Sequence, residues 1–401
     1  MTSVAPAPAA TGPFELDPRD PAFLADPHLV YDALRPEQRL VADPIGWSAI
    51  TYAGCDASFH DPALIPGIDP LLEQLGFGAL WGTPGRTLTD SEGADHSRLR
   101  RVVSPWFTAR RIAALRERTR ALVDAQLDAH DPAVPLELVG ELVDVVPARL
   151  FCWMVGAADG DDEQLAAWSK DLLLVFTATE AMVEPVRNAK AALAGYTHEL
   201  LARKRQDPGD DLATVLAQAS AAGAIDEHDA FCLLEELLSA SVDNTANTAG
   251  LALHSLAEHP DAWAHAHAHP DEVAQVVEEC GRFQPAIRHT IKYAVADTTV
   301  DGTPVAAGEF VTVRIAAAHR DPDVFADPHR LDVTRPLLKP QLAFGAGRHY
   351  CLGAALGKME LQEMVGGVTR RWPSASVAAG ASLSINAAGL VHRLPLDLEA
   401  S

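Results

Sequence analysis

Cysteines are few in this sequence, and none lies in a recognisable pair. The 401 residues include only five cysteines, at Cys55, Cys152, Cys232, Cys280 and Cys351, with no CxxC spacing. Scattered cysteines in an odd number argue against both a structural zinc site and a disulfide framework. Because such cysteine usage is typical of a reducing compartment, we expect a cytoplasmic protein.

Long apolar runs and an excess of basic residues are also missing. No stretch reaches the roughly 18 apolar residues of a membrane span, and the first residues do not resemble a signal peptide. The 32 Lys and Arg residues are outnumbered by 55 Asp and Glu residues, which gives a net charge of −23. This balance argues against binding to nucleic acid, whose phosphates require clustered cations, and against an anionic membrane surface. We therefore expect a soluble protein, monomeric, with a small molecule as its ligand.

The chain has no internal repeat and no clear interdomain linker. Residues 1–13 are rich in Ala and Pro, and we expect a disordered arm there. Residues 14–401 are expected to form a single domain, which is long enough to bury a large core with a cofactor inside it.

Helical periodicity dominates the sequence. One helix is expected to begin after Thr108, and another to run from about Asp226 to His259 over roughly 50 Å. The middle of this second helix, SASVDNTANT, is a poor helix former, which suggests a site pressed against its midpoint. A hairpin is predicted around Asp301-Gly302, and a short strand pair in the tail SLSINAAGLVHRLPLDLE. The fold class is therefore mainly α with a minor β region.

The segment LAFGAGRHYCLGAALGKMELQ contains the most informative cysteine. Cys351 ends a loop with Gly345 and Gly347, and the residues after it have helical character. A cysteine just before a helix N-terminus is stabilised as thiolate by the helix dipole and by unpaired backbone N–H groups. The glycines allow the backbone to approach a large flat ligand. A lone cysteine is more often a small buried hydrophobe, and only the flanking pattern favours a ligand here.

That flanking pattern, FGxGxHxCxG, resembles the haem-binding loop of the cytochrome P450 superfamily at Phe344, Gly345, Gly347, His349, Cys351 and Gly353. The resemblance extends from about Asp90 to Trp372. It implies the triangular, mostly α cytochrome P450 fold and one b-type haem, with Cys351 as the ligand of the iron. Because no CxxCH occurs, covalent attachment of the haem is not expected.

The resemblance also implies residues that hold the haem propionates. His96 and Arg100 are four residues apart and share one helical face, from which they can pair with a carboxylate. The alternative for such a pair is a solvated face. Lys292 stands where relatives have an arginine, and it keeps the charge but lacks the bidentate fork. Arg288 is a possible substitute, and His349 matches the remaining propionate ligand of the loop.

The family's ExxR pair is matched by Glu279 and Arg282, which again share a helical face. Its downstream arginine is matched by Arg335. We interpret these three residues as structural, not catalytic.

In the family, an acid followed by a threonine lies on the long helix above the haem. Alignment through the Ala-Asn pair at 246–247 places Asp243 at the acid, Asn244 at the usual Thr and Ser241 at the usual Gly. Thr245 lies one position later, about 100° around the helix. These four are the candidate catalytic residues for proton delivery to dioxygen. The alternative is that Asp243 and Asn244 only interrupt and solvate the helix.

The implied activity is that of a monooxygenase acting on a small, apolar or aromatic organic molecule, with a secondary metabolite as one candidate. Electrons would come from an external ferredoxin and ferredoxin reductase, because no flavin or iron–sulfur module is fused to the chain. The ferredoxin would meet a local basic patch formed by Arg100, Arg101, Arg110, Arg111, Arg348 and Lys358. Two alternatives stay open. One is oxidative coupling, ring formation or a peroxide-driven oxidation on the same haem, and the other is a non-catalytic haem-binding protein.

Overall fold

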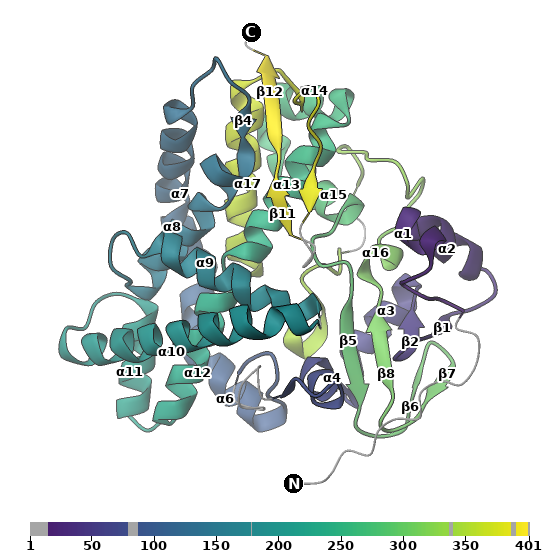
Figure 1. The fold of residues 1–401 in the computed structure, drawn as a ribbon, viewed down its shortest axis with the longest axis horizontal. Coiled ribbons are helices and arrows are strands. Elements are labelled where there is room, and N and C mark those ends of the chain that lie inside the picture. The colour runs from purple at the N-terminus through teal and green to yellow at the C-terminus, as the bar shows by residue number, and fades with distance from the viewer. Residues whose placement is uncertain (1–14, 79–86, 178, 337–339, 386–389, 400–401) are drawn as a thin grey trace. The chain divides into compact units, whose positions relative to one another are not determined.

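The computed structural model describes residues 15–78, 87–177, 179–336, 340–385 and 390–399 (Figure 1). The arm expected at residues 1–13 lies outside this described part. The chain forms two compact units, each built from three separate segments. The first consists of Met1–Ala79, Gly281–Leu331 and Pro336–Cys351, and the second of Leu80–Cys280, Asp332–Arg335 and Leu352–Ser401. The single domain expected over residues 14–401 stays a prediction.

A mixed sheet forms the centre of the first unit. Its strands are β1 (Leu40–Asp43), β2 (Gly46–Ala49), β3 (Leu64–Pro66), β5 (Thr290–Ala294) and β8 (Phe310–Val313). They lie in the order β1-β2-β8-β5-β3, with β2 and β8 parallel and the other neighbours antiparallel. All four residues of β8 are buried, as expected for a strand in the middle of a sheet. The helices of this unit are α1 (Pro21–Ala25), α2 (Pro27–Leu34), α3 (Tyr52–His60), α4 (Ile68–Gln74) and α16 (Ile315–Ala318).

The hairpin predicted around Asp301-Gly302 is present. Strands β6 (Thr298–Val300) and β7 (Thr303–Val305) pair antiparallel across these two residues. Asp301 has φ 46° and Gly302 has φ 85°. Two successive residues with positive φ are what a two-residue hairpin of type I′ requires, and Asp-Gly is a preferred pair for it.

Helices make up most of the second unit (Figure 1). The helix expected after Thr108 is α7 (Ala109–Ala129), and Thr108 is its extended N-cap residue. Helix α7 packs along α17 (Ala354–Arg371), where Arg116 and Arg120 both bond the buried Glu363. The other helices are α6 (Gly93–Val103), α8 (Val145–Val155), α9 (Asp162–Leu173), α10 (Val183–Gln206), α11 (Leu212–Ala221), α12 (Glu227–Ala240), α13 (Asp243–Ala257), α14 (Pro260–Ala268) and α15 (Val273–Phe283). Within the described residues, no helix combines the length and the apolar character needed to cross a membrane.

The long helix expected from Asp226 to His259 was predicted wrongly as one element. It begins as expected, since Asp226 and Asp229 form a capping box at the start of α12. It is then interrupted at residues 241–242, and a second helix, α13, continues to Ala257. The interruption lies inside the segment of low helix propensity. There, Ser241 Oγ donates to the Leu237 carbonyl at 2.5 Å, a side-chain bond of the kind that competes with helical pairing.

Two small sheets complete the second unit. Strands β4 (Leu136–Glu137), β12 (Pro395–Glu399) and β9 (Ser374–Val377) form an antiparallel sheet in that order. The strand pair predicted in the tail is confirmed as β10 (Ser384–Ile385) and β11 (Val391–Arg393). The fold class, mainly α with a minor β region, is therefore as expected.

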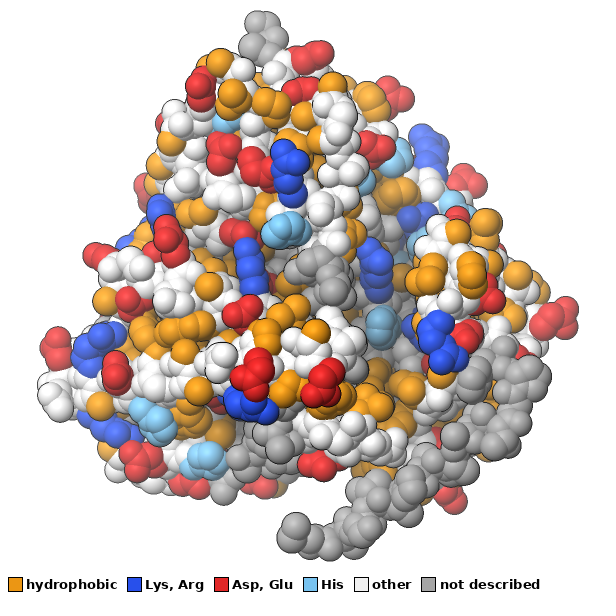
Figure 2. Space-filling model, in the orientation of Figure 1, with side chains coloured by type: hydrophobic (Ala, Val, Ile, Leu, Met, Phe, Trp, Pro, Cys, Tyr) orange, Lys and Arg blue, Asp and Glu red, His pale blue; other side chains and the backbone are white. Residues whose placement is uncertain are grey.

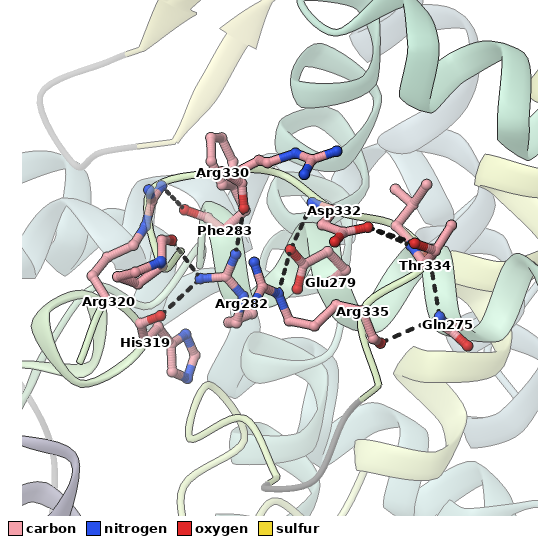
Figure 3. Close-up of polar contacts among 12 residues, drawn as sticks. Gln275, Glu279, Arg282, Phe283, His319, Arg320, Arg330, Asp332, Thr334 and Arg335 are labelled. Atoms are coloured by element: carbon pink, nitrogen blue, oxygen red, sulfur yellow. Dashed lines mark hydrogen bonds and ion pairs between the residues drawn. The ribbon is translucent and has the colours of Figure 1, made fainter. Parts of the chain in front are cut away.

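Buried ionic contacts surround the end of α15 (Figure 3). In the second unit, Glu279 is fully buried and accepts from the Asp332 N–H at 2.9 Å and from Arg335 Nε at 3.2 Å. In the first unit, the buried Arg282 donates to the carbonyls of His319, Pro328 and Arg330 at 2.8–3.0 Å. Arg335 therefore pairs with Glu279, and Glu279 and Arg282 of this helix both have the structural contacts that the sequence led us to expect.

Acidic side chains on the face drawn in Figure 2 are scattered among basic and apolar ones. The net charge of −23 is therefore not gathered into one continuous acidic patch on this face.

Removing Glu279 should be strongly destabilising. In Glu279→Ala, the Arg335 guanidinium would stay buried without this carboxylate, and we expect the free energy of unfolding to fall by roughly 3–5 kcal/mol. Urea unfolding measures the loss. The matched control is Glu227→Ala, which removes an exposed partner of Arg205 and should cost less than about 1 kcal/mol. Equal stability of the two variants would contradict the buried network.

Candidate functional site

The loop that precedes Cys351 is a tight, glycine-dependent turn. Gly345 and Gly347 have φ 68° and 67°, and the Cys351 N–H donates to the Phe344 carbonyl at 2.9 Å. A Cβ added at Gly347 would lie 2.6 Å from the Phe59 carbonyl oxygen. Only glycine allows this approach, so Gly347 has a steric reason as well as a conformational one.

A buried histidine anchors the start of this loop. His319 Nε2 accepts from the Leu342 N–H at 2.7 Å. Burial, helped by the charge of Arg282, lowers the pKa of His319 to about 3, so its ring is neutral and can accept. Arg282 in turn holds the His319 carbonyl. The structural arginine is therefore connected to the cysteine loop through His319, a residue that the sequence pattern did not identify.

Cys351 differs from the other four cysteines in exposure. It is exposed, whereas Cys55, Cys152, Cys232 and Cys280 are buried. Burial raises the pKa of Cys55, and that of Cys152 to about 12, which keeps both as thiols. Cys351 lies two residues before Gly353, the N-cap of α17. A position just before a helix N-terminus stabilises an anion, so the predicted thiolate has the local setting that it needs.

Of the basic residues expected in the first unit, Lys292 lies close to the loop. It is buried on β5, and its Nζ is 5.5 Å from the centre of the Phe59 ring, the residue that also contacts Gly347. His349 lies in the turn itself and is half-buried. Arg288 is exposed before β5. The first unit thus provides one exposed thiol, a buried ammonium and a histidine, a donor set that suits an iron centre with carboxylate substituents.

Of those expected in the second unit, His96 and Arg100 share helix α6. His96 is buried and Arg100 is half-buried, so a merely solvated face is excluded for His96. Arg98, on another face of the helix, bonds Asp229 at 2.6 Å and fixes α6 to the start of α12. The assignment of His96 and Arg100 to propionates stays a prediction.

A glutamate on α12 holds the chain segment before α6. The Glu236 carboxylate accepts from the N–H groups of Leu88 and Thr89 at 2.7 and 2.9 Å, and from Thr89 Oγ1 at 2.6 Å. Burial raises the pKa of Glu236, while these donors oppose the shift. Sequence reasoning missed this clamp, because a single glutamate within a helix gives no local signal.

Asp243 is buried at the first position of α13. Its side chain is 3% exposed, and its carboxylate is hydrogen-bonded to Ser169 Oγ on helix α9. Burial raises the pKa of Asp243 to about 6, with the Ser169 hydrogen bond and Lys170 lowering it and Asp144 raising it. Asp243 is therefore buried with a hydrogen-bond partner, and Ser169 is a partner that the sequence did not reveal.

The neighbours of Asp243 bond the last carbonyls of α12. Asn244 Nδ2 donates to the Ala240 carbonyl at 3.4 Å, and its side chain is otherwise exposed. Thr245 is half-buried. Farther along α13, Asn247 Oδ1 accepts from the Val391 N–H at 2.9 Å and fixes β11 to the helix. Asn247 thus has a structural role that explains why a polar residue is buried there.

Comparison with known proteins identifies relatives along nearly the whole chain. The family model described as Cytochrome P450 matches residues 164–372. Luteothin monooxygenase from Streptomyces thioluteus is 30% identical over 368 residues, which cover 90% of each protein. Vitamin D(3) 25-hydroxylase from Pseudonocardia autotrophica is 31% identical over 377 residues, or 92% of each.

Solved structures confirm the expected architecture. CalO2 superposes with a TM-score of 0.86 at 26% identity, covering 96% of this chain and 99% of that one. The tirandamycin C-bound P450 monooxygenase TamI superposes with a TM-score of 0.82 at 28% identity, covering 96% of this chain and all of that one. The fold predicted from the cysteine loop is therefore correct.

The raised pKa of Asp243 predicts a pH-dependent stability. A carboxyl with a pKa of about 6 in the folded state and 3.8 otherwise stabilises the fold fully below pH 3.8 and loses that contribution as the pH rises through 6. Asp243→Asn is neutral at every pH, so it should gain up to about 3 kcal/mol relative to the parent protein between pH 4 and pH 8. Urea unfolding across this range is the measurement. Parallel stability curves for the two proteins would contradict the shift.

Proposed function

Because this chain belongs to the cytochrome P450 family, we propose that it is a haem-thiolate monooxygenase that oxidises a small apolar or aromatic molecule of secondary metabolism. The single observation behind the site assignment is the exposed Cys351 at the end of a glycine-lined turn directly before α17. The family's cofactor is haem b. Relatives named for different small molecules support a class of substrate, not an individual compound.

The residues present fit this cofactor. Cys351 would bind the iron as thiolate, and the loop residues Phe344, Gly345 and Gly353 would shape the backbone around it. The cationic or neutral donors for the propionates would be His96, Arg100, Lys292, Arg288 and His349. When bound, haem ligated by thiolate supplies the activation of dioxygen and favours O–O cleavage.

The balance of the reaction defines what the chain must provide. One oxygen atom of dioxygen enters the substrate and the other leaves as water, which consumes a pair of electrons and a pair of protons. Asp243, with a pKa of about 6, is suited to hold and release a proton near neutral pH. The Asn244 amide does not readily pass a proton on. The hydroxyl hydrogen of Ser241 is already donated to the Leu237 carbonyl. A water held near Thr245 or a hydroxyl of the substrate would therefore continue the relay.

Electrons would come from an external ferredoxin and its reductase. Of the expected basic patch, Arg101, Arg110 and Arg348 are exposed. Arg111 instead pairs with Asp210 and lies over the Trp106 ring, and Lys358 pairs with Glu278. Exposure alone selects Arg101 and Arg110 in the second unit, and Arg348 in the first, as the arginines that we assign to docking. We also propose a monomer located in the cytoplasm, and five cysteines that form no disulfide support this location.

A second candidate is favoured by Asn244. An amide at this position weakens the proton relay, which suits oxidative coupling, ring formation or a peroxide-driven oxidation. Product analysis with labelled dioxygen separates these reactions, because only the monooxygenase places label in the product. Label absent from the product despite turnover would favour the second candidate.

Replacement of Cys351 tests the site directly. Cys351→Ala and Cys351→Ser should lose the thiolate signature in the spectrum of the reduced carbon monoxide complex, because the sulfur ligand is gone. Cys152→Ala, which removes a buried thiol of α8, should keep that signature. If both Cys351 variants kept the signature, Cys351 would not be the ligand of the iron.

Asp243→Asn tests the proton relay. An amide cannot supply the proton, so turnover should fall by about 10²–10⁴, the usual contribution of a positioned acid or base. Asn244→Thr should leave turnover similar or change how much reducing power is lost as peroxide. Substrate consumption and peroxide are measured together. If Asp243→Asn kept near-normal turnover and lost no more reducing power as peroxide, the second candidate would be favoured.

A further inference from the structure

Ser169 lies between two hydrogen-bond acceptors of the interrupted helix. It belongs to the buried face of α9, next to the cluster of Ala148, Ala166 and Val242. Its Oγ is 2.7 Å from the Ser239 carbonyl oxygen and is also hydrogen-bonded to the Asp243 carboxylate. One hydroxyl therefore connects α9 both to the end of α12 and to the start of α13.

A serine hydroxyl has one hydrogen and can donate it to one of these acceptors at a time. When Asp243 is protonated, its own O–H donates to Ser169 Oγ, and Ser169 donates to the Ser239 carbonyl. Every hydrogen then has an acceptor. When Asp243 is ionised, Ser169 must turn its hydrogen toward the carboxylate, and the Ser239 carbonyl loses that donor. The two protonation states of Asp243 thus correspond to two orientations of one hydroxyl.

The charged groups near Asp243 are a coupled pair. Lys170, the next residue on α9, forms an ion pair with Asp144 at the start of α8. Their effects on the Asp243 carboxyl are opposite in sign, since the lysine favours the anion and the aspartate disfavours it. These two charges oppose each other. After burial, the Ser169 hydrogen bond is therefore the largest influence on the pKa of Asp243.

We propose that Ser169 is a positioning residue for Asp243, which accepts from the protonated acid, turns its own hydroxyl hydrogen to the carboxylate when the proton leaves, and thereby eases release of the proton. This inference rests on the proposed monooxygenase reaction, in which Asp243 gives up a proton. No atom is gained or lost by Ser169: the proton passes from the Asp243 carboxyl to the relay, and the Ser169 hydrogen changes only its acceptor. The role ties proton delivery to the position of helix α9.

The test follows the Asp243 carboxyl itself. Infrared difference spectra of the haem-loaded protein against its Asp243→Asn variant report how the carboxyl titrates with pH. Ser169→Ala removes a donor to the anion, so the midpoint should move upward by roughly one pH unit. Ser169→Thr keeps the hydroxyl and should restore the parent midpoint. Thr119→Ala, which removes an equally buried hydroxyl that bonds Leu115 within α7, should leave the midpoint unchanged.

Turnover gives the second readout. Protonated Asp243 is the proton donor, so the rate should fall as the pH rises through the pKa of Asp243. In Ser169→Ala, this fall in rate should occur at a higher pH. A purely structural role would scale the rate equally at every pH. The proposal would be overturned if the infrared midpoint did not change in Ser169→Ala. It would also be overturned if the midpoint changed while the fall in turnover at high pH stayed at the same pH. The infrared titration does not depend on which oxidation is catalysed, so failure of the proposed reaction is distinguishable from failure of this role.

Discussion

Backbone carbonyls at an interrupted helix must find new donors, and this constraint organises the candidate catalytic region. Side chains bond the carbonyls at the end of α12: Ser241 bonds Leu237, Ser169 bonds Ser239 and Asn244 bonds Ala240. Because these donors are side chains, they bring polar groups to the junction of α12 and α13. Asp243 then has hydrogen-bonding neighbours in a place where an isolated carboxylate would be too costly to bury.

Within the first unit, a second constraint acts on the cysteine loop. The neutral ring of His319 holds the start of the loop, Arg282 holds the His319 carbonyl, and Gly347 closes the turn against Phe59. These contacts lock the backbone by packing and hydrogen bonds, so the sulfur of Cys351 can be exposed while its loop stays rigid. A rigid loop with one exposed thiol is the preorganisation that a metal ligand requires.

Several arginines in this acidic protein satisfy buried carboxylates. Arg335 pairs with Glu279, Arg116 and Arg120 with Glu363, and Arg314 with Asp43. Arg116 and Arg120 lower the pKa of Glu363, which therefore stays ionised although its side chain is buried. Other basic residues pair nearer the surface, as Arg111 does with Asp210 and Lys358 with Glu278.

The sequence by itself determined the features that depend on neighbouring residues. The place of Cys351 before a helix, the turn at Asp301-Gly302 and the start of α7 after Thr108 follow from local spacing and backbone preference, and each is found in the structure. Only the tertiary structure decided the interruption of the long helix, the Glu236 clamp and the Ser169 contact. Ser169 is 74 residues from Asp243, and Thr89 is 147 residues from Glu236. Serine and glutamate are common on helices and carry no local pattern, so these partners become visible only when packing brings the distant segments together.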